Sequence, residues 1–411
     1  MWYARRYRMF PTNAQSECMD EHRNIYRQAY NHFLYRLNHA DGRTLMRDLR
    51  DELPELKKWW TDLKEVHSRA LQRVAERLDN NLSRLAKMKE KGRKVGQLKW
   101  KAPSEYRSFT YSQSGFELKN TSGRTAVLRL SKIGEISIRY HRELSDDATI
   151  KEIHVKKERT GEWFASLVVD DGEPTPEPPK NPDECVGIDV GILKYVHDSD
   201  GFAVGSLDLS DERERLEREQ RKLSRKEHGS ANYKRQRRRV AECHADLKRK
   251  RRDFLHRLSN YYATEYDFVA MEDLNVAGMM QFKSNSRNRA SAAWGTFLRM
   301  LEYKCEREGT HFVAVNPAGT TKECSRCGIK TEKPLWVREH SCPACGFEAD
   351  RDENAAYNVL ARGLKDVGVV HPERTPVETA LPVSTASVDA KRVVEAGSPA
   401  LKERTASAVS E

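Results

Sequence analysis

Hydrophobic and polar residues alternate from residue 2 to residue 10, and the alternation stops at Pro11. A period of two is typical of a half-buried strand. Thr12 or Asn13 can cap a helix, and apolar residues then recur at helical spacing. We therefore predict a strand over residues 2–10, followed by a helix that buries one face. That face would carry Tyr26, Ala29, Tyr30, Phe33, Leu34 and Leu37.

Helical spacing continues to about residue 90, with a short helix expected at residues 45–49 and a long one after it. The apolar stripe of the long helix comprises Leu71, Val74, Leu78, Leu82 and Leu85. Residues 11–103 are thus predicted to form a helical recognition unit. Its last part, residues 87–101, is strongly basic and is either a phosphate-contacting loop or a solubilising linker. Lys94 and Lys99 are its candidate nucleic-acid contacts.

Residues 104–172 change to short alternating segments between turn residues, a pattern that predicts antiparallel strands. We expect a small β-barrel that also includes residues 2–10, because a lone N-terminal strand would have no partner. The barrel domain would then comprise residues 1–10 and 104–172 and carry the helical unit as an insertion. The predicted strands are residues 108–111, 116–119, 125–130, 135–140, 150–156 and 163–169.

A Pro-rich linker at residues 173–183 separates the two halves of the chain. Beyond it, strands are expected at residues 186–191, 193–197, 202–207 and 268–271. A long helical stretch should run from Ser210 to about Thr264, with a break at His228-Gly-Ser230. After Gly363 the periodicity is lost, and residues 364–411 are predicted to be a disordered tail.

With 411 residues the chain is longer than one comfortable core, so several units are expected. Lys and Arg total 73 against 62 Asp and Glu, and the net charge of +11 favours polyanionic partners. Basic residues dominate the helical stretch, which indicates a nucleic-acid groove wall more than a solvated helical hairpin. The candidate contacts there are Arg235, Arg238, Arg239, Lys248, Arg249 and Arg252.

No apolar run reaches the roughly 18 residues that cross a bilayer, and the opening segment lacks the apolar part of a signal peptide. We therefore expect a cytoplasmic protein with no membrane partner. Four cysteines are scattered singly, as suits free thiols in a reducing compartment. They are Cys18, Cys185, Cys243 and Cys305.

Three carboxylates in the second half are candidates for one metal site, namely Asp189, Glu272 and Asp352. Gathered carboxylates repel one another unless a divalent cation lies between them. Asp189 would share a strand face with glycines, so a metal or phosphodiester could approach it closely. A strand-end turn is the alternative for Asp189, and Asp273 is the alternative ligand to Glu272.

Asp352 is expected to lie in the first turn of a helix. Asp350 and Glu353 resemble an acidic capping box, and the helix should run to Gly363. Positions three, four, seven and eight after Asp352 are apolar, so its carboxylate should face inward. Asp350 is then the cap, and a role limited to the helix dipole fits Asp350 better than Asp352.

Two Cys-x-x-Cys-Gly knuckles stand fourteen residues apart, at Cys324, Cys327, Cys342 and Cys345. Four thiolates in two such pairs suit tetrahedral zinc and leave no open position, so we predict a structural zinc site. A redox pair or an iron–sulfur cluster is the alternative. The basic and aromatic residues between the knuckles suit contact with a nucleic-acid strand, although Trp336 could equally form the core of the ribbon.

Taken together, these motifs resemble the TnpB family of transposon-encoded proteins, relatives of type V CRISPR effectors. The resemblance runs from Tyr7 to about Ala361. It rests on Gly-Ile-Asp-Val-Gly at 187–191, Glu-Asp-Leu-Asn at 272–275, Trp294-Gly295, the four cysteines and Asp-Arg-Asp-Glu-Asn-Ala-Ala at 350–356.

The resemblance implies an α+β multidomain protein with a RuvC-like nuclease domain of the RNase H fold and an inserted zinc ribbon. The nuclease domain would comprise residues 184–320 and 347–363, and the ribbon residues 321–346. It also implies RNA-guided cleavage of double-stranded target DNA, with a guide RNA from the transposon end. Asp189, Glu272 and Asp352 would hold two catalytic Mg²⁺ ions. Whether the protein acts as a monomer or a weak dimer is left open.

Two rival functions belong to other classes. A catalytically silent RNA-guided repressor would keep guide and target binding, but its usual sign, a broken acidic triad, is absent. A transposase that joins strands through a Tyr nucleophile would need a neighbouring histidine pair, and no His-x-His stands near a Tyr.

Overall fold

The computed structural model describes residues 1–39, 46–121, 123–192, 194–275, 293–334 and 336–368, and the backbone of a short strand at residues 388–389. The chain forms two compact units. The first comprises Met1–Pro174 and Arg215–Ala245, and the second comprises Thr175–Glu214 and Asp246–Glu411. The units are described one at a time.

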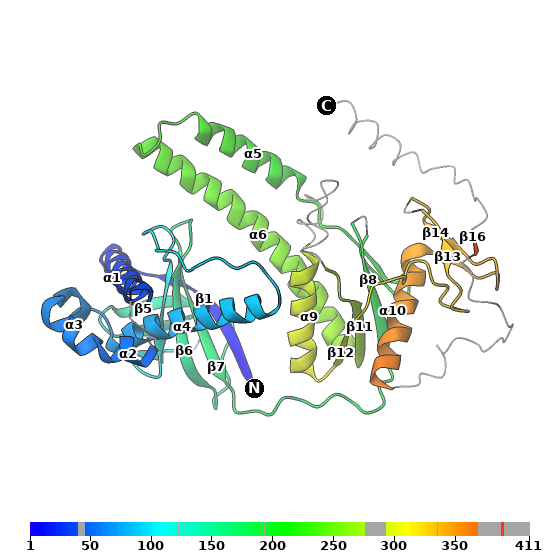
Figure 1. Ribbon diagram of the computed structural model, residues 1–411, viewed down its shortest axis with the longest axis horizontal. Coiled ribbons are helices and arrows are strands. Elements are labelled where there is room, and N and C mark those ends of the chain that lie inside the picture. The colour runs from blue at the N-terminus through cyan, green and yellow to red at the C-terminus, as the bar shows by residue number, and fades with distance from the viewer. Residues whose placement is uncertain are drawn as a thin grey trace. The chain divides into compact units, whose positions relative to one another are not determined.

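An antiparallel sheet of seven strands forms the body of the first unit (Figure 1), in the order β2-β6-β7-β1-β5-β4-β3. All six predicted strands between residues 104 and 172 are present, and the N-terminal strand joins them. The bounds are β1 Trp2–Phe10, β2 Ser108–Ser112, β3 Phe116–Lys119, β4 Thr125–Leu130, β5 Gly134–Arg139, β6 Thr149–Lys157 and β7 Trp163–Asp170.

Strand β1 lies in the middle of this sheet. It pairs with β7 from Trp2 to Met9 and with β5 at Met9 and Phe10. The sheet ends in β2 and β3, which do not pair with each other, so it is a half-barrel where a barrel was expected. Helices cover the surface beside β2 instead. The Tyr26 ring of the first helix packs against Phe109 with ring centroids 5.3 Å apart.

The helices of the first unit follow β1 in the chain. They are α1 Asn13–Asn38, α2 Met46–Asp51, α3 Leu53–Trp59, the short 3₁₀ helix η1 Thr61–Lys64 and α4 Ser68–Glu90. Thr12 caps α1 in a reciprocal capping box with Gln15. The stripe predicted on α4 is buried only as far as Leu78, and Leu82 is 41% exposed.

A mixed sheet of five strands organises the second unit, in the order β10-β9-β8-β11-β12. Strands β8, β11 and β12 are parallel, and β9 and β10 continue the sheet in antiparallel fashion. The bounds are β8 Cys185–Val190, β9 Lys194–Asp198, β10 Ala203–Gly205, β11 Phe268–Glu272 and β12 His311–Val315.

Helices cover both faces of this sheet, so β8 and β11 are buried throughout. One face packs Val186 and Ile188 against the end of α6 and against α9 (Trp294–Glu308). The other face packs Phe268 and Ala270 against α10 (Arg351–Val367). Strands covered on two sides read as continuous apolar runs, as these two do.

A helical hairpin follows β10, with α5 at Ser210–Ser224 and α6 at Ala231–Glu265. The predicted break at residues 228–230 is confirmed. The end of α6 is fixed to β9 by the buried Asp198, whose carboxylate accepts a 2.9 Å hydrogen bond from the Tyr262 hydroxyl. None of the helices in the described ranges is long and apolar enough to cross a bilayer.

The cysteine-rich segment contributes three short strands, β13 Thr331–Glu332, β14 Glu339–Ser341 and β15 Glu348–Asp350, and β13 pairs with β16 Val388–Asp389. Helix α10 does not stop at Gly363. It ends at Val367, with Gly368 in a left-handed conformation. Gly363 is a packing residue, since a Cβ there would lie 2.6 Å from Ala270. The predicted tail lies mostly outside the described residues.

Candidate metal centres and nucleic-acid surface

Two of the three candidate carboxylates end adjacent parallel strands. The ladder between β8 and β11 pairs Ile188 with Met271, and Asp189 and Glu272 are the next residues along each strand. Both side chains are buried, with exposed fractions of 6% and 5%. Because Asp189 alternates with Ile188, and Glu272 with Met271, both point to the α10 side of the sheet.

Helix α10 brings the third carboxylate to the same face. A Cβ added to Gly187 would lie 2.2 Å from the Ala356 carbonyl oxygen, so the helix packs directly on bare strand backbone. Asp352 lies in the first turn of that helix. Its backbone N–H donates to the Asp350 carboxylate, which caps the helix as predicted. Asp189 is the next residue after Gly187 on the same strand face, so the helix start and the strand end meet there.

The three carboxylates interact electrostatically. The pKa of Asp189 is raised well above its usual value by burial, then by the charges of Glu272 and Asp352. Burial also raises the pKa of Glu272, and Asp352 adds to that rise. Burial without a cation disfavours the ionised forms. Folding therefore brings the three carboxyl groups together. Ionising all of them at once costs free energy unless a positive charge lies nearby.

Two polar partners of this acidic group were not expected from the sequence. The Thr320 hydroxyl donates a 2.5 Å hydrogen bond to the Glu272 carboxylate. The Arg338 guanidinium forms an ion pair with Asp352. Arg338 lies between the two cysteine knuckles, in the segment whose basic residues are predicted from the sequence to contact nucleic acid. Asp273, the alternative to Glu272, is exposed, and its backbone N–H donates to the Val315 carbonyl.

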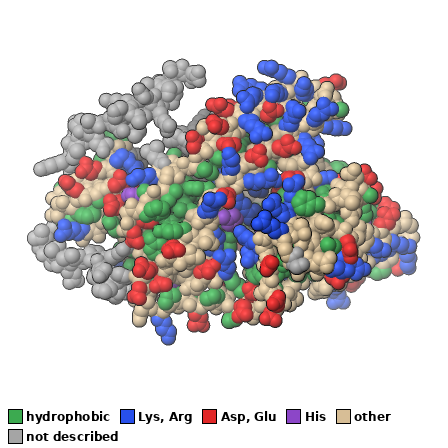
Figure 2. Space-filling model, turned by 180° about the vertical axis from the view of Figure 1, so that it is seen from behind, with side chains coloured by type: hydrophobic (Ala, Val, Ile, Leu, Met, Phe, Trp, Pro, Cys, Tyr) green, Lys and Arg blue, Asp and Glu red, His purple; other side chains and the backbone are tan. Residues whose placement is uncertain are grey.

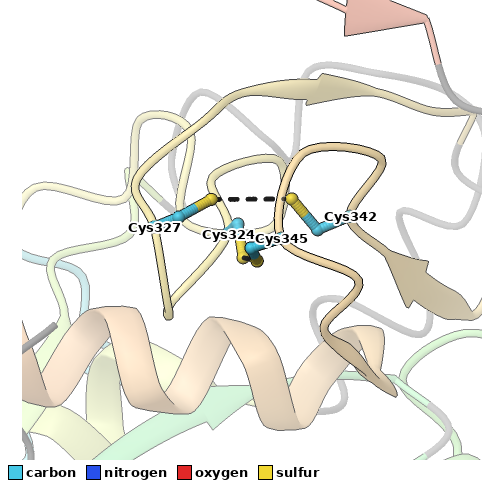
Figure 3. A group of neighbouring side chains, drawn as sticks. All are labelled: Cys324, Cys327, Cys342 and Cys345. Carbon is cyan, nitrogen blue, oxygen red and sulfur yellow. Dashed lines mark hydrogen bonds between the residues drawn. The ribbon is translucent and has the colours of Figure 1, made fainter. Parts of the chain in front are cut away.

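The four knuckle cysteines form a compact group (Figure 3), with all four Sγ atoms within 4.8 Å of one another. The Sγ atoms of Cys324 and Cys345 are 3.7 Å apart, and those of Cys327 and Cys342 are 3.6 Å apart. A tetrahedral ion with metal–sulfur bonds of about 2.3 Å would separate its sulfurs by roughly 3.8 Å. The spacing is therefore compatible with structural zinc.

Buried asparagines on α10 hold the first knuckle. Asn354 accepts a 2.9 Å hydrogen bond from the Ser325 N–H and donates to the Glu323 carbonyl. Asn358 donates to the carbonyls of Thr320 and Glu323. Two amide side chains four residues apart on a helix can bind one loop in this way. The cysteine group and the acidic group are thus both attached to α10.

Burial raises the pKa of Cys327 to about 11 and raises that of Cys324 still further, whereas backbone and side-chain hydrogen bonds lower the pKa of Cys342 despite its burial. The thiols of Cys324 and Cys327 would therefore ionise readily only with a cation among them. Among the His, Cys, Asp and Glu residues that the structure describes, the four cysteines are the group whose possible metal-binding atoms all lie within 4.8 Å of one another. The carboxylates are more widely spread.

Family comparisons agree with these features. A family described as "Cas12f1-like, TNB domain" matches residues 294–359, and one described as "Probable transposase" matches residues 155–283. A Streptomyces pristinaespiralis protein named "Putative RNA-guided DNA endonuclease" is 37% identical over 307 residues, which cover 74% of this chain and 73% of the relative. The chain belongs to the TnpB family.

Another relative of this TnpB family member is the Escherichia coli protein "Putative RNA-guided DNA endonuclease InsQ". It is 28% identical over 273 residues, which cover 62% of this chain and 66% of the relative. A cryo-EM structure of a Cas12f1–sgRNA–target DNA complex superposes with a TM-score of 0.57 at 16% identity, over 85% of this chain and 83% of that one. The fold is therefore shared with Cas12f1.

The basic residues predicted to contact nucleic acid are all exposed in this TnpB family member. Lys and Arg side chains crowd the tip of the α5–α6 hairpin, at the upper right of Figure 2. Some are engaged by neighbours, since Arg238 pairs with Glu242 at 3.4 Å and Arg252 donates to His256 at 3.2 Å. The exposed set is Lys94, Lys99, Arg235, Arg238, Arg239, Lys248, Arg249 and Arg252.

Proposed function

We propose that this chain is an RNA-guided DNA endonuclease that hydrolyses phosphodiesters with divalent cations. The observation that carries the proposal is the gathering of Asp189, Glu272 and Asp352 around one face of the second unit's sheet, where their charges interact. Family membership supports the same activity, because the Streptomyces relative is named for RNA-guided DNA cleavage.

The nuclease part is proposed to be RuvC-like, with the RNase H fold. Its support is the sheet order, in which a three-stranded antiparallel meander, β8 to β10, continues through β8 into the parallel strands β11 and β12. We further propose the domain boundaries given by the sequence, with the zinc ribbon inserted at residues 321–346. The ribbon follows β12 and ends just before α10, so it interrupts the path from sheet to helix.

The residues fit two Mg²⁺ ions, because hard carboxylate oxygens are the ligands these ions prefer. Both ions would be held by the carboxylates of Asp189, Glu272 and Asp352. When bound, they would activate water and stabilise the leaving oxygen of an in-line attack. Thr320 holds the Glu272 carboxylate in one orientation, and Arg338 compensates the charge of Asp352.

Guide RNA and double-stranded target DNA are the proposed partners. The exposed lysines and arginines would hold the nucleic-acid backbone through charge, while base pairing between guide and target would select the sequence. A silent repressor would not need three mutually repelling carboxylates, two of which are buried. Their retention in one site favours hydrolysis over binding alone.

The test is a cleavage assay with the purified protein and its own RNA. RNA that copurifies is sequenced, and the complex is challenged with a plasmid library randomised beside a matching target. We expect cleavage that needs Mg²⁺ and guide. Asp189→Asn should keep RNA binding and lower cleavage by about a thousandfold or more, the scale of preorganised charge stabilisation. Asp273→Asn, one residue beyond Glu272, is the matched control and should cleave normally. Undiminished cleavage by Asp189→Asn would refute the assignment.

A further inference from the structure

A buried histidine lies beside the acidic group. His197, on β9, is directly opposite Asp189 in the antiparallel ladder between β8 and β9. Opposed residues of such a ladder extend from the same face of the sheet, with Cβ atoms about 5 Å apart. The His197 side chain therefore shares the α10 face with Asp189. A carboxylate and an imidazole on opposed positions are long enough to meet at one ion between them.

Backbone hydrogen bonds on both sides of this pair fix the position of His197. On one side, the Gly191 N–H donates to the Tyr195 carbonyl at 3.2 Å. On the other, the Ser199 N–H donates to the Gly187 carbonyl at 3.0 Å, and the Ser199 hydroxyl accepts a 3.1 Å bond from the Gly187 N–H. A slip of one residue would turn His197 to the opposite face, and these bonds oppose it.

The imidazole of His197 is almost enclosed, and the protein does not satisfy it. Its exposed fraction is 6%, and its Nδ1 is a buried atom that has no hydrogen-bond partner among the described residues. A buried polar atom without a partner costs folding free energy. A cation bound to the ring nitrogen would supply the missing partner, since neutral imidazole is the commonest metal ligand in proteins.

An imidazole nitrogen would change which ions the acidic group prefers. It adds a donor without adding negative charge, so it does not increase the repulsion among Asp189, Glu272 and Asp352. Nitrogen is also a softer donor than a carboxylate oxygen. Mg²⁺ keeps oxygen ligands and water, whereas first-row transition ions bind imidazole readily.

We propose that His197 is a further ligand of the divalent-cation site, and that its nitrogen lets this site bind a first-row transition ion more tightly than carboxylates alone would. Mg²⁺ remains able to bind through the carboxylates. The inference rests on the proposed metal-dependent hydrolysis and deepens it, because it names the class of ion that the site selects.

The test uses the full chain with its zinc retained and its RNA removed, because RNA itself binds Mn²⁺. Mn²⁺ is the probe, and bound Mn²⁺ is measured by electron paramagnetic resonance. Ions that still bind to Asp189→Asn are subtracted as nonspecific. In the parent, Mn²⁺ should show the hyperfine coupling of a directly bound nitrogen.

His197→Leu should abolish the nitrogen coupling and weaken Mn²⁺ binding by about tenfold or more, the scale on which supporting residues of metal sites act. Mg²⁺ affinity, measured by displacement of Mn²⁺, should stay within about twofold, because water can replace the missing donor. His197→Gln keeps a polar group at the same position, which protects the fold. It should also lose the coupling, while its melting temperature without metal stays that of the parent.

His22→Leu is the matched control. His22 is also buried, with an exposed fraction of 4%, and its Nδ1 also has no partner among the described residues, but it lies on α1 in the first unit. This variant should bind Mn²⁺ like the parent and keep the nitrogen coupling.

A nitrogen coupling that is absent from the parent, or that persists in His197→Leu, would overturn the proposal. Equal losses of Mn²⁺ and Mg²⁺ affinity in His197→Gln, together with a lower melting temperature in metal-free buffer, would show a structural role and overturn it as well. A parent protein that binds neither ion in a way that depends on Asp189 would instead refute the metal-dependent function itself.

Discussion

The cysteine group and the acidic group are both attached to α10, yet they are assembled in opposite ways. The cysteines come from two tight knuckles, and their sulfur atoms already have the spacing of a tetrahedral site. The carboxylates come from two strands and a helix, and their charges oppose one another. Local turns build the first site, whereas the second depends on tertiary packing.

The difference agrees with the proposal that the cysteine group is structural and the acidic group reactive. A preassembled and closed set of thiols gains by holding an ion permanently. An acidic group whose ionised form is unfavourable without cations would, under the proposed function, exchange metal and substrate. The favourable packing of α10 on the sheet therefore has to offset the unfavourable repulsion between the carboxylates.

The largest expected effect comes from breaking the cysteine group. Cys345→Ser should lower bound zinc from about one ion per chain to nearly none. The fold would then lose a zinc-binding free energy on the order of 10 kcal/mol. Residues 321–346 should become sensitive to protease, and cleavage should be lost because Arg338 is carried by this segment. Metal analysis and limited proteolysis measure both. Cys18→Ser, outside the group, should retain zinc.

Gly187→Ala tests the packing that assembles the acidic group. The new Cβ would meet the Ala356 carbonyl at 2.2 Å, and overpacking against backbone should cost about 3 kcal/mol of unfolding free energy. Cleavage should fall with it, since α10 carries Asp352. Gly205→Ala on β10, where a Cβ meets nothing within 4 Å, should lose neither stability nor activity. Denaturant titration measures the unfolding free energy of the parent and of both variants, and equal values for the parent and Gly187→Ala would contradict the prediction.

The repulsion should be visible as a pH dependence. The folded protein binds protons at Asp189 and Glu272 more tightly than the unfolded chain does, because their pKa values are raised. These carboxyls thus favour folding at low pH and lose that contribution as pH rises through the raised values. In metal-free buffer, the melting temperature of Asp189→Asn relative to the parent should rise from pH 5 to pH 8.

The same comparison cancels the buried histidines, such as His22 and His340, whose lowered pKa values give the opposite slope in both proteins. Added Mg²⁺ should stabilise the parent more at pH 8 than at pH 5 and leave Asp189→Asn almost unaffected. A difference in melting temperature that stays flat with pH would show that the carboxylates do not repel.

The smallest effect is expected at Thr320. Thr320→Val removes the hydroxyl that donates to Glu272, a hydrogen bond worth about 1 kcal/mol, so cleavage should fall roughly fivefold. Thr320→Ser keeps the hydroxyl and should restore the parent rate. Single-turnover cleavage is the measurement, and equal rates for Val and Ser would remove Thr320 from the site.

The strands, and the gathering of the three carboxylates near one another, could be predicted because each has a local signal. Alternation marks β2 to β7, and the apolar offsets after Asp352 identify its inward face. The end of α10 could not be read in this way. Gly363 has the composition of a helix stop, but it packs against Ala270, a contact that only the folded sheet reveals.

The partners of the site also escaped prediction. Thr320, Arg338 and Asn358 are polar residues without a motif, and each gains its role from a neighbour distant in sequence. The predicted barrel is present as a half-barrel, because its edge strands β2 and β3 do not pair with each other and a helix packs beside β2. Tertiary contacts decide such cases, and one sequence does not encode them as a local pattern.

The central place of β1 has a consequence for how the protein is made. Residues 2–10 leave the ribosome well before their two neighbours in the sheet, because β5 and β7 end only at Arg139 and Asp170. Pairing over such separations is slow, and an unpaired strand is prone to aggregate meanwhile. During synthesis, β1 therefore has to remain unpaired until most of the half-barrel has been made. Binding to a chaperone or to the helices that follow it in the chain would protect it during that time.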